Sequence, residues 1–253
     1  KGTTPRMESD YPILSSGLFN GMSTGAPILI RFENNNTRSE AYTSQRDIPR
    51  PGHADFTGHV KFGGFEDYRG GGHFSGRLTT CLVAAGVIAK IVLSHVLNTD
   101  ISINAEILEI GGEKDLEAGL EKAIQAKDSI GGIVECRIKG LPVGLGEPFF
   151  DSVESVLAHA VFSIPAIKGI EFGKGFAAAK MFGIEHNDAI LDNSGKTLTN
   201  NAGGIVGGIS NGNDLEFRVV VKPTSSTPKI QKSYNWDSDE VEEFSIKGRH
   251  DLC

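Results

Sequence analysis

Glycine is the feature that most limits what this sequence can fold into. It supplies 32 of the 253 residues, about one residue in eight, where about 7% is usual. Three glycines stand together at 70–72, and five more lie within the stretch 200–212. Because glycine adopts positive φ without steric cost, these clusters predict tight turns and places where the backbone can approach a ligand closely.

Charge and cysteine content argue against several classes of protein. There are 25 Lys and Arg against 32 Asp and Glu, a net charge of −7, whereas nucleic-acid and membrane-surface binders need a basic surface. Three cysteines in a chain of this length argue against a secreted disulfide framework. The longest apolar stretch, 78–97, contains Lys90 and His95, and charged groups are costly inside a membrane. We therefore expect a cytoplasmic protein that binds neither nucleic acid nor membrane.

Strand and helix patterns alternate along the chain, with no Pro- or Ser-rich linker between them. Apolar runs bounded by turn residues predict strands at 26–32, 101–110, 132–139 and 215–221. Helical patterns occupy 77–98, 113–127 and 151–162, the last with Asp151 or Ser152 as N-cap. The helix at 77–98 is apolar nearly all round, which predicts burial, and the polar stretch 33–52 predicts a long loop. The expected fold is α+β, in one domain over residues 1–253.

Residues 50–77 hold the densest group of candidate functional side chains, including His53, His59 and His73. The glycines at 70–72 lead straight into the predicted long helix, whose first amides favour an anion; the less favoured alternative is that they only form a tight turn. His53 could transfer protons near neutral pH, or only hydrogen-bond a neighbouring carbonyl. A zinc site built from these histidines and Asp55 is disfavoured, because closely spaced Cys/His ligand pairs are missing.

Two segments near the C-terminus are further candidates. Lys222–Ser226 (KPTSS) brings together a cation, three hydroxyls and loop amides, which suit a phosphate or a carbonyl-rich ring, but the segment could also only end a strand. Arg249, His250 and Asp251 stand next to one another. Such a run at a chain end is usually solvated charge.

Taken together, these motifs resemble chorismate synthases of the shikimate pathway. The motifs occur in one order, from Arg50–Asp55 (RPGHAD) through Asp67–Thr79, Glu185–Asp188, Asn200–Gly212 and Lys222–Ser226 to Gly248–Cys253. The resemblance extends from about Thr3 to Cys253. It implies a lyase that converts 5-enolpyruvylshikimate 3-phosphate to chorismate and phosphate by 1,4-anti elimination, using reduced FMN without net redox change. It also implies a homotetramer whose α+β fold places helices between antiparallel sheets.

The resemblance assigns roles to individual residues. His53 matches a histidine that transfers a proton near the reduced flavin, and Asp251 matches an aspartate that works with flavin N5 in removing the substrate proton. Arg77 and Lys1 match substrate-binding positions, and no metal is implied. The expected FMN-binding residues are His73, Phe74, Ser75, Pro165, Ala166, Gly207, Lys222, Pro223, Thr224, Ser225, Ser226 and Arg249. NADPH is expected only if flavin reduction is intrinsic to the protein.

The sequence also departs from the family's pattern. The FMN triplet often reads Arg-Ser-Ser but is His73-Phe74-Ser75 here, and Leu252 replaces the usual proline of the last motif. The family's Ser-His-Gly element, with its other catalytic histidine, would precede Lys1, and a helical segment would follow Cys253. We therefore expect the chain to be incomplete at both ends and, as 253 residues, not fully active.

Two alternatives belong to other classes. A flavin or nicotinamide oxidoreductase would also need glycine-rich anion sites, but a G-x-G-x-x-G motif with an acidic residue about 20 positions further on is missing. A non-catalytic protein that binds FMN or a phosphorylated metabolite is the other. Phosphate release without consumption of reductant separates the lyase from both.

Overall fold

The structure is a computed structural model that describes residues 8–35, 46–97 and 99–246. The predicted site residues Lys1, Arg249 and Asp251 and much of the loop predicted at 33–52 lie outside these ranges. The described chain forms two compact units. We call Val92–Thr224 the sheet unit, and the remainder, up to Ile91 and from Ser225 onward, the loop unit. The assignment of one domain to 1–253 stays a prediction.

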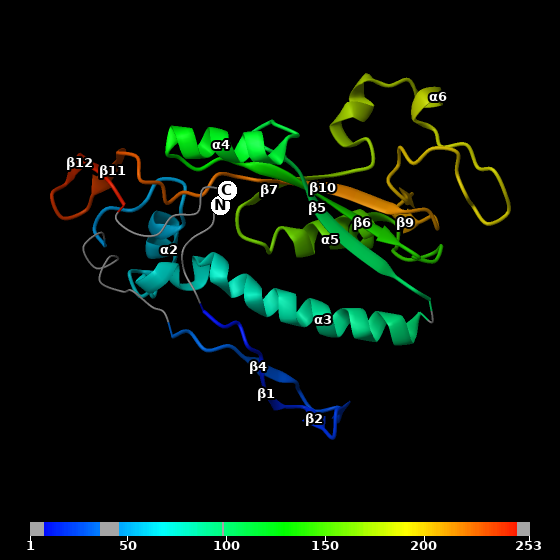
Figure 1. Cartoon of the computed structure of the whole chain (residues 1–253), viewed down its shortest axis with the longest axis horizontal. Coiled ribbons are helices and arrows are strands. Elements are labelled where there is room, and N and C mark those ends of the chain that lie inside the picture. Colours follow the sequence, from blue (N-terminus) through cyan, green and yellow to red (C-terminus); the bar gives the residue numbers. More distant parts are fainter. Residues whose placement is uncertain (1–7, 36–45, 98, 247–253) are drawn as a thin grey trace. The chain divides into compact units, whose positions relative to one another are not determined.

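The sheet unit contains a four-stranded antiparallel sheet in the order β5-β6-β10-β7. Its strands are β5 (Ser102–Ile110), β6 (Gly132–Lys139), β7 (Ile167–Phe172) and β10 (Leu215–Val221). Figure 1 shows α5 (Val153–Val161) running beside this sheet. The core forms where the helix meets the strands, and its buried residues are Ile138, Val161, Ile205, Leu215 and Phe217.

Strand β10 shows why this sequence forms a sheet with one apolar face. Leu215 and Phe217 are buried in the core, whereas the alternate residues Glu216 and Arg218 pair with charged residues on neighbouring strands. Glu216 lies 3.0 Å from Arg137, and Arg218 lies 3.0 Å from Glu171. This period of two is the alternation expected of a strand with one buried face.

Two helices of the sheet unit, α4 (Leu116–Ala126) and α5, begin at side-chain caps. Asp115 accepts hydrogen bonds from the backbone N–H groups of Glu117 (3.0 Å) and Ala118 (3.2 Å) at the start of α4. Ser152 accepts one from Ser155 (3.1 Å) at the start of α5. Such caps satisfy amides that have no partner within the helix. The predicted helices at 113–127 and 151–162 are thus confirmed, with Ser152 as N-cap.

The short elements of this unit are η3 (Phe149–Asp151), η4 (Gly175–Lys180), α6 (Gly183–His186), β8 (Ile205–Val206) and β9 (Ile209–Ser210).

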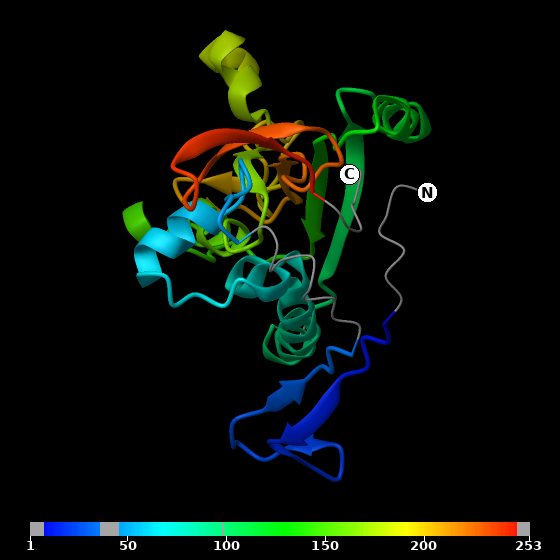
Figure 2. The ribbon, with the colours of Figure 1, turned by 90° about the vertical axis from the view of Figure 1, so that its left-hand side faces the viewer.

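The loop unit is made of hairpins and short helices. In Figure 2 the dark blue ribbon is β1 (Ile13–Ser16) paired with β4 (Leu29–Arg31), and the red hairpin joins β11 (Gln231–Asn235) to β12 (Glu240–Phe244). Strand β4 is shorter than the strand predicted at 26–32. The other elements are β2 (Leu18–Phe19), β3 (Met22–Ser23), α2 (Asp55–Phe62), η1 (Arg69–Phe74) and η2 (Gly76–Leu78).

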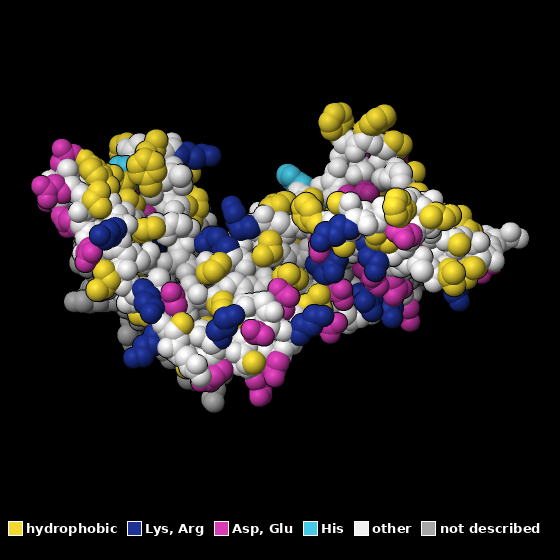
Figure 3. Space-filling view, turned by 90° about the horizontal axis from the view of Figure 1, so that it is seen from above, with side chains coloured by type: hydrophobic (Ala, Val, Ile, Leu, Met, Phe, Trp, Pro, Cys, Tyr) yellow, Lys and Arg dark blue, Asp and Glu magenta, His cyan; other side chains and the backbone are white. Residues whose placement is uncertain are grey.

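The long helix α3 (Thr79–Val96) confirms the helix predicted at 77–98 but not its burial. None of its residues is buried, and Val83 and Val96 are 68% and 72% exposed. An apolar surface all round a helix needs neighbours on every side, and the described residues supply them only in part. By length and composition alone, Gly76–Val96 could also cross a membrane, a test that core helices of soluble proteins pass as well. Hydrophobic side chains reach the surface at several other places too (Figure 3).

Candidate functional site

The candidate site is built around the turn that precedes α2. The His53 backbone N–H donates to the Arg50 carbonyl (3.2 Å), and the chain enters α2 at Asp55. The turn places the side chains of Arg50, His53 and Asp55 against one another. Asp55 accepts hydrogen bonds from Arg50 Nε (2.7 Å), Arg50 Nη2 (2.8 Å) and the Arg50 backbone N–H (3.0 Å). This forked contact is the bidentate geometry that guanidinium and carboxylate groups favour.

Asp55 also contacts the imidazole of His53, whose Nδ1 lies 2.6 Å from Asp55 Oδ1. Burial on its own would raise the pKa of Asp55, but the hydrogen bonds and charges of Arg50 and His53 outweigh it and hold the pKa well below its usual range. The three side chains are 10% (Arg50), 18% (His53) and 28% (Asp55) exposed. Asp55 is therefore an ionised acceptor, fixed in a partly desolvated site.

The glycine triplet closes over the other edge of the imidazole. Gly71 has φ +85°, and a Cβ built on it would lie 3.8 Å from His53 Nε2. The backbone thus reaches this nitrogen at a position where a side chain would be strained. The triplet does not lead directly into the long helix as expected. It lies in η1, and η2 follows before α3 begins at Thr79.

The serines at the end of KPTSS belong to the same cluster. Arg50 Nη1 donates to Ser226 Oγ (3.0 Å), and Ser225 Oγ donates to the carbonyl of Gly52 (2.7 Å). On β11, Ser233 Oγ donates to the Pro49 carbonyl (2.6 Å). These hydrogen bonds join segments more than 170 residues apart in sequence. Ser225 and Ser226, both predicted to bind FMN, therefore fix the RPGHAD turn.

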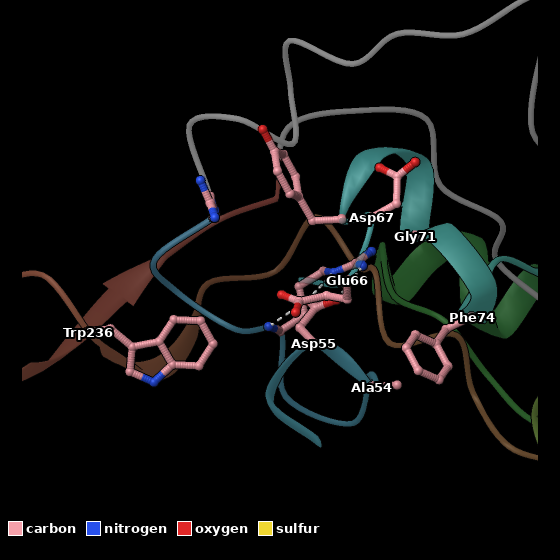
Figure 4. Close-up of a pocket in the computed structure, with 10 residues that line it drawn as sticks. Ala54, Asp55, Glu66, Asp67, Gly71, Phe74 and Trp236 are labelled. Carbon is pink, nitrogen blue, oxygen red and sulfur yellow. Dashed lines mark hydrogen bonds and ion pairs between the residues drawn. The ribbon is translucent and has the colours of Figure 1, made fainter. Parts of the chain in front are cut away.

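A pocket of about 580 Å³, including the part open to solvent, lies beside this cluster. Figure 4 shows Trp236 on one side of Asp55 and Phe74 on the other, with Asp67 and Gly71 nearby. The lining combines aromatic rings, guanidinium groups and carboxylates, and consists of Arg46, Arg50, Ala54, Asp55, Glu66, Asp67, Tyr68, Gly71, Phe74 and Trp236.

The predicted FMN triplet is only partly in this pocket. Phe74 lines it and packs against Gly58, where an added Cβ would lie 2.7 Å from the ring. His73 is exposed and outside the lining. Ser75 accepts a hydrogen bond from the backbone N–H of Arg77 (3.3 Å) at the start of η2.

Arg77, the predicted substrate-binding arginine, is paired with acidic groups of the N-terminal segment. Its Nη2 lies 2.9 Å from Asp10 Oδ1 and 3.2 Å from Glu8 Oε2. It also donates to the carbonyl of Glu33 (3.3 Å). The guanidinium that the resemblance assigns to a substrate anion is thus paired with carboxylates of the protein itself.

The remaining predicted residues lie in the sheet unit. The Lys222 backbone N–H donates to the Ala166 carbonyl (2.9 Å), and Ala166 itself has φ +71°. Burial and the nearby charge of Lys168 lower the pKa of Lys222, so the two lysines form a local cationic site. Thr224 accepts a hydrogen bond through its carbonyl from Ser129 Oγ (2.7 Å). Pro165 and Pro223 are exposed beside them, whereas Gly207 belongs to the separate turn between β8 and β9.

The second glycine cluster is held by Asp188, the last residue of the EHND motif. Its carboxylate accepts from Thr199 Oγ1 (2.6 Å) and from the backbone N–H groups of Asn201 (2.8 Å) and Ala202 (2.9 Å). Burial tends to raise the pKa of Asp188, but these donors lower it overall. The glycine-rich turn is therefore fixed to the EHND segment.

Sequence reasoning missed three parts of the site. It considered Asp55 only as a zinc ligand, although a carboxylate two residues from a histidine is itself a signal for pairing. It gave no role to Trp236, which stacks on His59 with ring centroids 4.5 Å apart. Trp236 is far in sequence from the residues at 50–77, so no pattern in the sequence linked it to them. It also overlooked Glu66, whose Oε1 lies 3.0 Å from His59 Nδ1.

Comparisons with known proteins agree with one another. The family profile described as Chorismate synthase matches residues 1–253. A chorismate synthase from Chitinophaga pinensis is 70% identical over 253 residues, which are all of this chain and 75% of that protein. The chorismate synthase of Methanosarcina barkeri is 46% identical over 278 residues, covering 98% of this chain and 75% of that protein. A crystal structure of chorismate synthase superposes with a TM-score of 0.68 at 27% identity, covering 85% of this chain and 72% of that one. The predicted α+β fold is thereby confirmed.

Proposed function

The chain belongs to the chorismate synthase family, and from this premise we propose which of its residues carry the reaction. Members of the family are soluble lyases of the shikimate pathway that use reduced FMN and act on 5-enolpyruvylshikimate 3-phosphate. The 1,4-anti elimination breaks one C–O bond to phosphate and one C–H bond, and forms a new C=C bond. The protein therefore has to bind anions, exclude water and move a proton.

The residues that line the pocket of the loop unit support binding of the required cofactor. Reduced FMN carries an aromatic ring system and a phosphate, and when bound it would supply electron density to the substrate as the phosphate leaves. Tyr68, Phe74 and Trp236 offer aromatic and apolar surface, while Arg46 and Arg50 offer guanidinium groups. The three acidic lining residues already have cationic or imidazole partners: Asp55 pairs with Arg50, Glu66 with His59 and Asp67 with Arg69. The donor set thus suits an anionic aromatic ligand.

His53 is the proposed proton-transfer group. The observation that supports this role most is its position: His53 does not itself line the pocket, but it is partly buried against Asp55, which does, with one nitrogen engaged by that carboxylate. Imidazole exchanges protons near neutral pH, and a positioned general acid or base contributes about 10²- to 10⁴-fold to a rate. We assign removal of the substrate proton to Asp251, which lies outside the described residues.

The remaining assignments concern binding. Arg77 and Lys1 are proposed to bind the anionic groups of the substrate, and Arg77 has to exchange its contacts with Glu8 and Asp10 to do so. The FMN-binding assignments of the triplet, of Arg249 and of the sheet-unit residues stay proposals. The cationic pair Lys168 and Lys222 supports an anion at the KPTSS segment.

Three finer properties are also proposed. The homotetramer is supported by the exposed apolar surface of α3, and analytical ultracentrifugation tests it. A cytoplasmic location is supported by Lys90 and His95 within the apolar stretch 78–97, and cell fractionation tests it. NADPH is used only if the protein reduces its own flavin, which an anaerobic assay of flavin reduction by NADPH decides.

An anaerobic phosphate-release assay with reduced FMN and 5-enolpyruvylshikimate 3-phosphate tests the main proposal. The natural protein should release phosphate without net consumption of reductant, and His53→Ala should be about 10²- to 10⁴-fold slower. Reductant consumed in proportion to product would indicate an oxidoreductase. Binding of FMN without any phosphate release would indicate a non-catalytic protein.

A further inference from the structure

The proton-transfer role of His53 requires its two ring nitrogens to differ, one carrying hydrogen and the other able to accept it. Within the loop unit, both nitrogens lie close to fixed charges. His53 Nδ1 is 2.6 Å from Asp55 Oδ1, and Arg50 Nη2 is 3.0 Å from Nδ1 and 3.3 Å from Nε2. The contact with Asp55 decides the tautomer, because it is the shortest and because Arg50 Nη2 already donates to Asp55 Oδ1 at 2.8 Å.

A guanidinium can only donate hydrogen bonds, and an ionised carboxylate can only accept them. The contact at 2.6 Å therefore requires hydrogen on Nδ1, donated to Asp55. In the neutral ring the acceptor lone pair is then on Nε2, which lies 3.3 Å from Arg50 Nη2 and near the backbone of Gly71. The opposite tautomer would place a bare Nδ1 against a carboxylate oxygen, with no hydrogen between them.

Asp55 can impose this choice because its own orientation is fixed. Three N–H groups of Arg50 donate to its two oxygens, and Arg50 is held in turn by Ser226. The carboxylate stays ionised, since its pKa lies well below the usual range. Hydrogen bonds thus run from Ser226 through Arg50 and Asp55 to His53, and they leave the imidazole little freedom to rotate.

We propose that Asp55, held by Arg50, is a positioning residue that keeps hydrogen on His53 Nδ1, so that Nε2 is the nitrogen that exchanges protons in the reaction. This inference rests on the proposed function of His53 and extends it to a residue that touches His53 rather than the reacting atoms. Carboxylate–histidine pairs fix tautomers in this way in other enzymes, where an asparagine in place of the aspartate permits the wrong tautomer.

The tautomer can be measured directly in the natural protein labelled with ¹⁵N-histidine, with reduced FMN bound, by solid-state NMR at pH 8. The His53 signals are identified by their loss in His53→Ala. We expect a protonated Nδ1 and a bare Nε2 in the wild type and in Asp55→Glu, and a population with hydrogen on Nε2 in Asp55→Asn. A wild-type ring with hydrogen on Nε2 would overturn the inference, whether or not Asp55→Asn folds.

Kinetics supply the second readout. Asp55→Asn should lower kcat for phosphate release by about 10²- to 10⁴-fold, with KM for the phosphorylated substrate within a few-fold, and Asp55→Glu should recover part of kcat. The control is Asp192→Asn, since Asp192 accepts hydrogen bonds from Ser194 in an exposed loop of the sheet unit. This control should keep wild-type kinetics. Asp55→Asn with wild-type kcat would contradict the inference.

Failure of the proposed function would look different. If His53→Ala released phosphate at the wild-type rate, His53 would not be the proton-transfer group, and the proposed function would fail whatever its tautomer. If His53→Ala were slow but the tautomer did not change in a folded Asp55→Asn, the function of His53 would stand and the role of Asp55 would be wrong.

Discussion

Asp55 and Asp188 each fix a loop that belongs to a family motif, the RPGHAD turn and the glycine-rich turn respectively, but they do so through different hydrogen-bond partners. Asp55 of the loop unit accepts hydrogen bonds from Arg50 and His53, two side chains that carry or can carry charge. Asp188 of the sheet unit accepts from the Thr199 hydroxyl and two backbone N–H groups. In both aspartates, donors outweigh the opposing effect of burial and lower the pKa.

The difference separates a chemical role from a structural one. Backbone amides fix the shape of the glycine-rich turn beside Asp188, but they exchange no proton during a reaction. The imidazole beside Asp55 can do so. A lowered pKa is therefore shared by both sites and cannot tell them apart, because structural hydrogen-bond networks also perturb pKa values. The chemistry of the partners makes the distinction.

The largest expected effect on stability comes from a glycine in the Asp188 region. In Gly173→Ala the new Cβ would lie 2.1 Å from the Asn201 carbonyl oxygen at φ +53°. We expect a loss of about 3 kcal/mol in the free energy of unfolding, from overlap and backbone strain together. In Gly71→Ala the nearest atom is 3.7 Å away at φ +85°, so the strain alone should cost about 1 kcal/mol.

Urea unfolding followed by circular dichroism measures both variants. Gly21→Ala is the control for strain without contact, because its φ is +76° and an added Cβ would meet nothing within 4 Å. Equal losses in Gly173→Ala and Gly21→Ala would show that the sheet-unit turn is not tightly packed.

Asp188→Asn should have the next largest effect. The substitution places an NH₂ group against at least one of the donors whose hydrogen bonds the carboxylate now accepts, which are the Thr199 hydroxyl and the backbone N–H groups of Asn201 and Ala202. An unsatisfied donor costs about 1–3 kcal/mol, so we expect a loss of about 2 kcal/mol in the same urea measurement. Asp192→Asn, in an exposed loop, should lose less than half as much. If Asp188→Asn were as stable as wild type, the structural role assigned to Asp188 would be wrong.

Both aspartates should make stability depend on pH in the same direction. A carboxyl group whose pKa is lowered by folding contributes fully above its unfolded pKa of about 4, and this contribution is lost as pH falls toward the folded value. Wild-type stability should thus decrease from pH 5 to pH 3, and the deficits of Asp55→Asn and Asp188→Asn should shrink over that range. Deficits that stay constant from pH 7 to pH 3 would contradict the lowered pKa values.

The smallest expected effects come from the outer partners of each aspartate. Thr199→Val removes the hydroxyl donor to Asp188, and Ser226→Ala removes the acceptor for Arg50 Nη1. Each should cost about 1 kcal/mol of unfolding free energy. Only Ser226→Ala should also slow phosphate release, by a few-fold, because it loosens Arg50. Slower phosphate release by a Thr199→Val variant that is as fully folded as wild type would contradict the purely structural role of the Asp188 region.

Sequence patterns predicted the sheet unit better than the loop unit, for a physical reason. The strands and helices of 101–162 and 215–221 have clear periods and caps, and the structure places them within a few residues of their predicted bounds. The exposure of α3 could not be predicted, because a pattern apolar all round says that a helix needs neighbours but not which residues supply them. The motifs identified His53, yet its contact with Asp55 depends on a turn, and the contact of Arg50 with Ser226 joins segments far apart in sequence.

One measurement tests most directly whether Asp55 has a chemical role and Asp188 a structural one. It is the pH dependence of kcat for anaerobic phosphate release, compared among wild type, Asp55→Asn and Asp188→Asn. Asp188→Asn should keep the shape of the wild-type profile even where its stability is lower, because its partners exchange no proton. Asp55→Asn should change that shape, since it alters the ring that transfers the proton. Profiles of the same shape in both variants, or a change confined to Asp188→Asn, would contradict the roles assigned to the two aspartates.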